Sequence, residues 1–345
     1  MDLGVRMSGV ILHHARKSLL LASLLALLSG SAVIAQTNPL DDAHIAPHQQ
    51  SERASVTRAP ALTPRDQPLR VDVNLVLVPV TVTDALGRPV LDLPANTFSL
   101  QEDGVQQPVR YFSAEDAPIS VALVVDFSDS MKNKIEYVKQ AVQEFFDNAN
   151  PADDYFVITV SNKPQVIAAS GDSVDTILDR LGMTPPKGGT ALFDAIYLGV
   201  AKLRAAKYKR KAMVVISDGG DNRSRYTFKE IKSVVSEADV LTYGIGIFDD
   251  MPIPLLKTIE ERMGRKWLGD ITFASGGRTV AADDRRKIPD IAAMVSRELR
   301  NQYVLGYTSS NPAKDGHWRK ISVQLAPSAT PKHVHYKEGY LAATQ

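Results

Sequence analysis

Two short, continuously apolar segments limit the possible folds of this chain more than any other feature. They are Val121 to Val125 and Met213 to Ile216. Asp126 follows the first directly, and Ser217 and Asp218 follow the second. Runs of this length without a polar residue are typical of strands that helices cover on both faces. The sequence therefore predicts two strands inside a parallel sheet, each ending in polar residues.

Between residues 119 and about 308, segments with strand patterns alternate with segments that have helical spacing. For example, Ile135, Val138 and Val142 recur on one face of a predicted helix. The predicted strands are 120–126, 155–161, 165–169, 212–217, 241–247, 278–281 and 302–308. The predicted helices are 133–148, 173–182, 190–206, 227–238, 254–265 and 287–300. This alternation indicates an α/β fold with a doubly wound, mostly parallel sheet.

The segments on either side of this region, 69–115 and 309–342, have strand patterns only. The alternation of apolar residues changes phase beside Pro79, which predicts a bulge or a bend. Asp103-Gly104 predicts a hairpin turn between strands at 98–100 and 109–111. We expect 309–342 to pair with 69–115, so that 119–308 is inserted into a small antiparallel β domain.

Residues 1–35 have the three parts of an export signal. A basic start leads into an apolar core from Leu19 to Leu28, and Val33-Ile34-Ala35 is a small-residue cleavage site. We expect cleavage, no stable membrane span afterwards, and a periplasmic or secreted protein. A retained membrane anchor is the alternative. Residues 36–68, which contain five prolines among polar residues, are predicted to be a disordered linker.

Composition excludes several classes of function. The chain has no cysteine, which excludes disulfides, zinc–thiolate sites and thiol catalysis. Its 40 Lys and Arg residues nearly balance its 39 Asp and Glu residues. This balance offers no electrostatic basis for binding nucleic acid.

Oxygen-bearing side chains gather where ligands bind in doubly wound sheets, outside the carboxyl ends of the strands. Asp126, Ser128 and Ser130 follow the first apolar run. Thr190 comes before a predicted helix, after Gly188-Gly189, and Asp218 follows the second apolar run. Together they supply oxygen ligands for a hard divalent cation such as Mg²⁺.

The chain resembles the von Willebrand factor type A family, and more narrowly the related domain of acidobacterial secreted proteins. Three motifs carry the resemblance: Asp-x-Ser-x-Ser at 126–130, Gly-Gly-Thr-Ala-Leu-Phe-Asp-Ala at 188–195 and Ser-Asp-Gly-Gly-Asp at 217–221. It covers about 119–308. The flanking β segments look like those of the narrower family.

The resemblance implies a metal-ion-dependent adhesion site. Ser128, Ser130 and Thr190 would bind the ion through their hydroxyl oxygens. Asp126 and Asp218 would act mainly through bound waters or as hydrogen-bond acceptors behind these ligands. The cofactor would be Mg²⁺, with Mn²⁺ or Ca²⁺ as alternatives. Neutral hydroxyls leave much of the cation's charge uncompensated, and one water position can pass to a Glu or Asp carboxylate of a partner protein. The implied function is a binding or adhesion module with no catalytic residue.

Two other functions stay open at this stage. A metal-assisted hydrolase would need Asp129 or Asp221 as general base, because 119–308 contains no histidine. A structural cell-envelope component would assemble through the edges of the flanking sheets. We expect Asp129 to point away from the ion, Asp194 to orient a loop and Asp221 to cap a turn.

Overall fold

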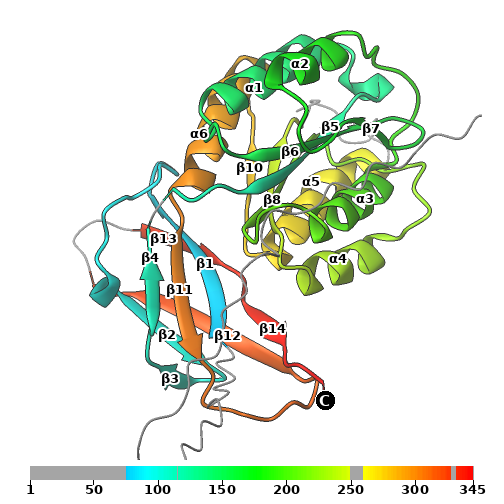
Figure 1. Cartoon of the computed structure of the whole chain (residues 1–345). Coiled ribbons are helices and arrows are strands. Elements are labelled where there is room, and N and C mark those ends of the chain that lie inside the picture. Colours follow the sequence, from blue (N-terminus) through cyan, green and yellow to red (C-terminus); the bar gives the residue numbers. More distant parts are fainter. Residues whose placement is uncertain (1–74, 115, 249–258, 328–331, 345) are drawn as a thin grey trace, which may run out of the picture. The chain divides into compact units, whose positions relative to one another are not determined.

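The computed structural model describes residues 75–114, 116–248, 259–327 and 332–344 (Figure 1). The predicted signal at 1–35, the predicted linker at 36–68 and residues 69–74 lie outside the described residues. Within the described ranges, no helix has both the length and the apolar character that crossing a bilayer requires.

A six-stranded sheet forms the centre of the α/β region, in the order β10-β9-β8-β5-β6-β7 (Figure 1). Its strands are β5 (Ser120–Asp126), β6 (Asp154–Val160), β7 (Gln165–Ala168), β8 (Lys211–Ser217), β9 (Leu241–Gly246) and β10 (Thr279–Ala281). Neighbouring strands run parallel except β6 and β7, which are antiparallel. The two apolar runs form β5 and most of β8, which lie side by side in the middle of the sheet.

Helices cover both faces of this sheet. One face carries α1 (Ile135–Asp147), α2 (Val174–Gly182) and α6 (Ile288–Arg300); the other carries α3 (Leu192–Arg204), α4 (Phe228–Glu237) and α5 (Ile259–Ala274) (Figure 1). Side chains of β5 alternate between the two cores, with Leu123 facing α1 and Val124 facing α3. This two-sided burial explains the continuous apolar runs, and the predicted α/β fold class is confirmed.

The flanking segments form two four-stranded antiparallel sheets, β13-β1-β11-β4 and β14-β12-β2-β3. Their strands are β1 (Leu75–Asp84), β2 (Phe98–Glu102), β3 (Val105–Gln107), β4 (Tyr111–Ser113), β11 (Tyr303–Thr308), β12 (Trp318–Leu325), β13 (Lys332–Tyr336) and β14 (Gly339–Leu341). Val80, Leu100 and Tyr307 belong to their shared core. The tail pairs with the N-terminal segment, as predicted: β12 with β2, and β13 with β1.

The strand predicted at 302–308 forms, but it belongs to a different sheet from the one expected. Its sequence pattern predicts a strand of the α/β region, but β11 pairs antiparallel with β1 and β4 in a flanking sheet. The helix-then-strand order of α6 and β11 resembles another α/β step. Sequence order does not determine which sheet a strand joins, since the pairing partners are distant in sequence.

The fifth helix also differs, because it runs to Ala274 rather than ending at 265. Gly264, one residue before the predicted end, lies inside α5. A Cβ atom at Gly264 would lie 2.6 Å from the carbonyl oxygen of Asp218. This glycine therefore lets the helix backbone approach the loop after β8, and it does not end the helix.

Two local predictions in the first flanking segment also need correction. No bulge occurs beside Pro79, because β1 keeps one register with β11 from Leu75 to Val80. Leu77 belongs to the exposed face and Val78 to the core, so the change of phase marks two faces of one regular strand. The Asp103-Gly104 turn is confirmed, but its return strand is β3, and β4 pairs with β11 instead.

Candidate functional site

The site is built where β5 and β8 end. These neighbouring strands are parallel, so Asp126 and Ser217 emerge at the same edge of the sheet. The Ser217 hydroxyl donates to Asp126 Oδ2 at 2.6 Å, and the Ser128 backbone N–H donates to Asp126 Oδ1 at 2.9 Å. Asp126 is completely buried. Its carboxylate thus joins the two strand ends and orients the turn that carries Ser128.

The electrostatics around Asp126 are unfavourable for a carboxylate without a cation. Burial, followed by the negative charge of nearby Asp218, raises the pKa of Asp126 to about 6, against the opposing effect of hydrogen bonds from Ser217 and Ser128. Asp218 is half-buried, and its Oδ1 accepts from the Gly220 N–H at 3.0 Å. A positive ion placed close by would relieve the repulsion between these two carboxylates.

Hydroxyl groups lie on the open side of this arrangement. A short 3₁₀ turn, Asp129–Met131, follows Ser128 and is anchored by the buried Met131. Across this turn, Ser128 Oγ and Ser130 Oγ lie 3.1 Å apart. Thr190 comes just before α3, and the Gly188 carbonyl joins its loop to the serine turn by accepting from the Asp129 N–H at 2.9 Å.

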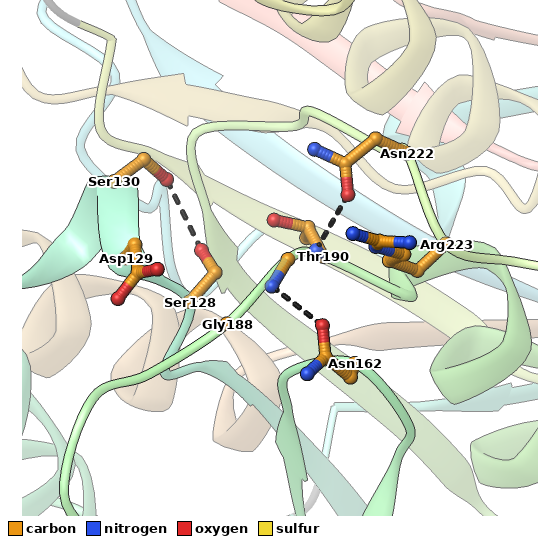
Figure 2. A pocket seen from close by; sticks show the side chains of 9 residues that line it. Ser128, Asp129, Ser130, Asn162, Gly188, Thr190, Asn222 and Arg223 are labelled. Atoms are coloured by element: carbon orange, nitrogen blue, oxygen red, sulfur yellow. Dashed lines mark hydrogen bonds between the residues drawn. The ribbon is translucent and has the colours of Figure 1, made fainter.

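A pocket of about 450 Å³ brings these hydroxyls together (Figure 2). Its lining residues are Ser128, Asp129, Ser130, Asn162, Gly188, Gly189, Thr190, Asn222 and Arg223. Three of the five predicted ion-binding residues therefore face one pocket. Asp126 and Asp218 do not line it; Asp126 is buried behind Ser128, to whose backbone it is bonded. No group of three or more His, Cys, Asp or Glu side chains suited to a metal occurs in the described part of the chain. The oxygen atoms that could bind a metal in this pocket belong mainly to hydroxyl groups.

Residues 121–220 match the family model for the von Willebrand factor type A domain. All five predicted residues lie within this match, which begins in β5 and ends just after β8. The α/β region therefore has a von Willebrand factor type A-like fold. Domains of this type are typically adhesion or protein-interaction modules, and no enzyme family is identified for this chain.

Solved structures similar to this chain include a von Willebrand factor type A protein from Catenulispora acidiphila. It is 13% identical, with 73% of this chain and 75% of that chain covered and a TM-score of 0.45. BatB from Bacteroides thetaiotaomicron is 20% identical, with 52% of this chain and 98% of that chain covered and a TM-score of 0.41. The pilus adhesin SpaC from Lactobacillus rhamnosus GG is 11% identical, with 72% of this chain and 48% of that chain covered and a TM-score of 0.45. No curated protein matches the chain.

Other carboxylates of the type A domain hold its loops in place. Asp129 points to Lys132, with 2.8 Å between Oδ1 and Nζ. Asp194 accepts from the backbone N–H groups of Arg225 and Tyr226. Asp221 accepts from the Ser224 hydroxyl at 2.6 Å and from the Phe193 N–H at 2.9 Å. These contacts agree with the predicted turn-capping and loop-orienting roles.

Sequence reasoning missed Asn162, Asn222 and Arg223, which form one wall of the pocket. Asn162 Oδ1 accepts from the Gly189 N–H at 2.8 Å, and Asn222 Oδ1 accepts from the Thr190 N–H at 2.9 Å (Figure 2). A signal for Asn162 existed, because it follows β6, the parallel neighbour of β5, at the same sheet edge.

Proposed function

We propose that this protein is an exported binding module that captures an acidic group of a partner protein through a divalent cation. One observation carries the proposal. Oxygen-bearing side chains from three separate segments meet at one sheet edge, with Ser128, Ser130 and Thr190 in the pocket and Asp126 beneath it. Such an all-oxygen set suits Mg²⁺, and Mn²⁺ or Ca²⁺ are alternatives.

In this proposal the five residues have distinct roles. Ser128, Ser130 and Thr190 would bind the ion through their hydroxyl oxygens, while Asp126 and Asp218 would act mainly through bound waters or as hydrogen-bond acceptors behind these ligands. Few formal charges touch the cation, so it stays electrophilic toward a Glu or Asp carboxylate of the partner. The raised pKa of Asp126 supports a cation here, because a nearby positive charge stabilises the ionised form of both aspartates.

The cellular location is part of the same proposal. The signal-like residues 1–35 support export to the periplasm or the medium. The two antiparallel sheets that flank the type A domain support membership of the narrower group that resembles acidobacterial secreted proteins.

Metal binding is the first test, with Mn²⁺ as the probe and electron paramagnetic resonance or calorimetry as the readout. Thr190→Ala removes one proposed ligand oxygen and should weaken Mn²⁺ binding by about tenfold or more, with the fold retained. Thr184→Ala is the matched control, since Thr184 precedes the same loop and its hydroxyl donates to the Arg180 carbonyl, away from the pocket. Equal Mn²⁺ affinity in the two variants would contradict the proposed site.

Partner capture is the second test. The protein is used as bait on the native cell envelope, with Mg²⁺ or with a chelator. The proposal expects partners that are retained only with the ion and are lost with Thr190→Ala. Retention that survives the chelator would instead favour metal-independent assembly through the sheet edges.

Contacts around the pocket weaken the hydrolase alternative. Its two candidate general bases are both engaged: Asp129 forms an ion pair with Lys132, and Asp221 accepts from Ser224 and Phe193. The hydrogen bond from Lys132 and its positive charge also lower the pKa of Asp129, which makes its carboxylate a weaker base.

A further inference from the structure

One wall of the pocket presents hydrogen-bond donors. Asn162 and Asn222 use their Oδ1 atoms to hold the backbone N–H groups of Gly189 and Thr190. Their Nδ2 groups remain as donors, and neither donates to any residue that the structure describes. Arg223 adds a guanidinium to the same wall. Such a wall suits an anion, because amide N–H and guanidinium groups donate hydrogen bonds and accept none.

Arg223 is the charged member of this wall. Within the described ranges, no carboxylate lies within ion-pairing distance of its guanidinium. Its backbone N–H donates to the Thr190 carbonyl at 3.1 Å, which ties it to a proposed ion ligand. Its side chain lies over Gly189, where an added Cβ atom would come within 2.7 Å of Arg223 Cγ. A residue without a side chain at 189 therefore leaves room for the arginine at the edge of the pocket.

Among the described residues that line the pocket, only Asp129 carries a formal negative charge, and it lies on the opposite side. Lys132 offsets that charge at 2.8 Å. In Figure 2, Ser128 and Ser130 lie on one side of Thr190 and Arg223 on the other. A carboxylate that reaches the centre of the pocket thus has Arg223, which has no ion-pair partner among the described residues, on one side. On the other side is Asp129, whose charge Lys132 offsets.

We propose that Arg223 is a specificity-determining residue that binds the partner's carboxylate together with the ion. This inference rests on the proposed function. A carboxylate has two oxygens; one would bind the ion, and the other would accept from the Arg223 guanidinium. The partner group is therefore a Glu or Asp side chain, and a Gln or Asn side chain, with only one acceptor oxygen and no charge, is rejected.

The test uses Mn²⁺ and two immobilised glycine–serine peptides, one with a single central Glu and one with Gln in its place. The wild-type protein should bind the Glu peptide only when Mn²⁺ is present and should not bind the Gln peptide. Arg223→Gln should weaken Glu-peptide binding about tenfold, the order expected for losing a charged hydrogen bond. Its Mn²⁺ affinity should stay equal or rise, because a neighbouring positive charge is removed. Arg223→Lys should recover part of the peptide binding.

Lys187→Gln is the matched control. Lys187 is exposed on the loop before α3, next to Gly188, but does not line the pocket. The inference is overturned if Arg223→Gln binds the Glu peptide as tightly as Lys187→Gln does, or if the wild-type protein binds both peptides equally. A wild-type protein that binds no Mn²⁺ refutes the proposed function itself. The metal and peptide readouts thus separate the two failures.

Discussion

At the scale of single residues, Gly188 determines how the loop before α3 reaches the pocket. Its φ of +79° lies in the left-handed region, and an added Cβ atom would lie 2.7 to 2.9 Å from the side-chain atoms of Asn162. Gly188→Ala should therefore lower the free energy of unfolding by about 1–3 kcal/mol, through backbone strain and displacement of Asn162. Chemical denaturation measures this change.

Gly182→Ala is the control for this prediction. Gly182 ends α2 with an ordinary backbone conformation, and an added Cβ atom would meet nothing within 4 Å. It should leave stability unchanged or raise it by up to about 1 kcal/mol. Equal losses in both variants would mean that the loop geometry at Gly188 imposes no requirement for glycine.

At the scale of elements, α5 contains two glycines whose replacement by alanine should change the stability of the fold in opposite directions. A Cβ atom at Gly264 would meet the backbone of Asp218 and Gly219, whereas one at Gly269 would meet nothing within 4 Å. Gly264→Ala should push the helix away from the loop after β8, with a loss of about 1–3 kcal/mol. Gly269→Ala should stabilise the helix by up to about 1 kcal/mol.

Because Gly264 contacts the Asp218 backbone, this pair also tests the candidate site. Gly264→Ala should weaken Mn²⁺ binding as well as stability, and Gly269→Ala should leave Mn²⁺ binding unchanged. Calorimetry in both variants measures the two effects. Normal Mn²⁺ affinity in a destabilised Gly264→Ala protein would show that the position of Asp218 is unimportant for the ion.

At the scale of the whole described fold, polar groups join the type A domain to the flanking sheets. Arg278 donates to the Gly87 carbonyl at 3.0 Å and forms an ion pair with the fully buried Glu298 of α6. The hydroxyls of Tyr243 and Thr81 lie 3.1 Å apart. His335 of β13 belongs to the same junction, since burial, followed by the positive charge of Arg278 and then His333, lowers its pKa to about 4.

This lowered pKa predicts that the stability of the folded protein depends on pH. The unfolded chain binds a proton at His335 near pH 6.5, and the folded chain resists protonation until about pH 4. The unfolded state therefore holds more protons in this window, and stability falls as the pH drops from about 6.5 to 4. His335→Gln should reduce this fall, measured as urea midpoints across the window. His333 is an exposed neighbour on β13, and His333→Gln should reduce the fall in stability less. Identical pH profiles for the wild-type protein and His335→Gln would contradict the prediction.

The sequence alone was sufficient to predict the features that depend on burial and on the spacing of apolar residues. Continuous apolar runs identified β5 and β8 as central strands because every residue of β5 is buried between two helical layers. Polar residues after those runs predicted that Ser128 and Asp218 lie at one sheet edge, since parallel strands bring their carboxyl ends together. Helical spacing identified α1, whose Val138 and Val142 are fully buried.

Only the tertiary structure decided which distant segments meet. It placed β11 in a flanking sheet, continued α5 past Gly264, and brought Asn162 and Arg223 to one pocket wall. The physical reason is that local sequence reports the exposure and period of a segment, whereas strand partners and close backbone approaches depend on contacts between residues far apart in the chain. A glycine at a close approach and a glycine that ends a helix look alike until the neighbouring element is known.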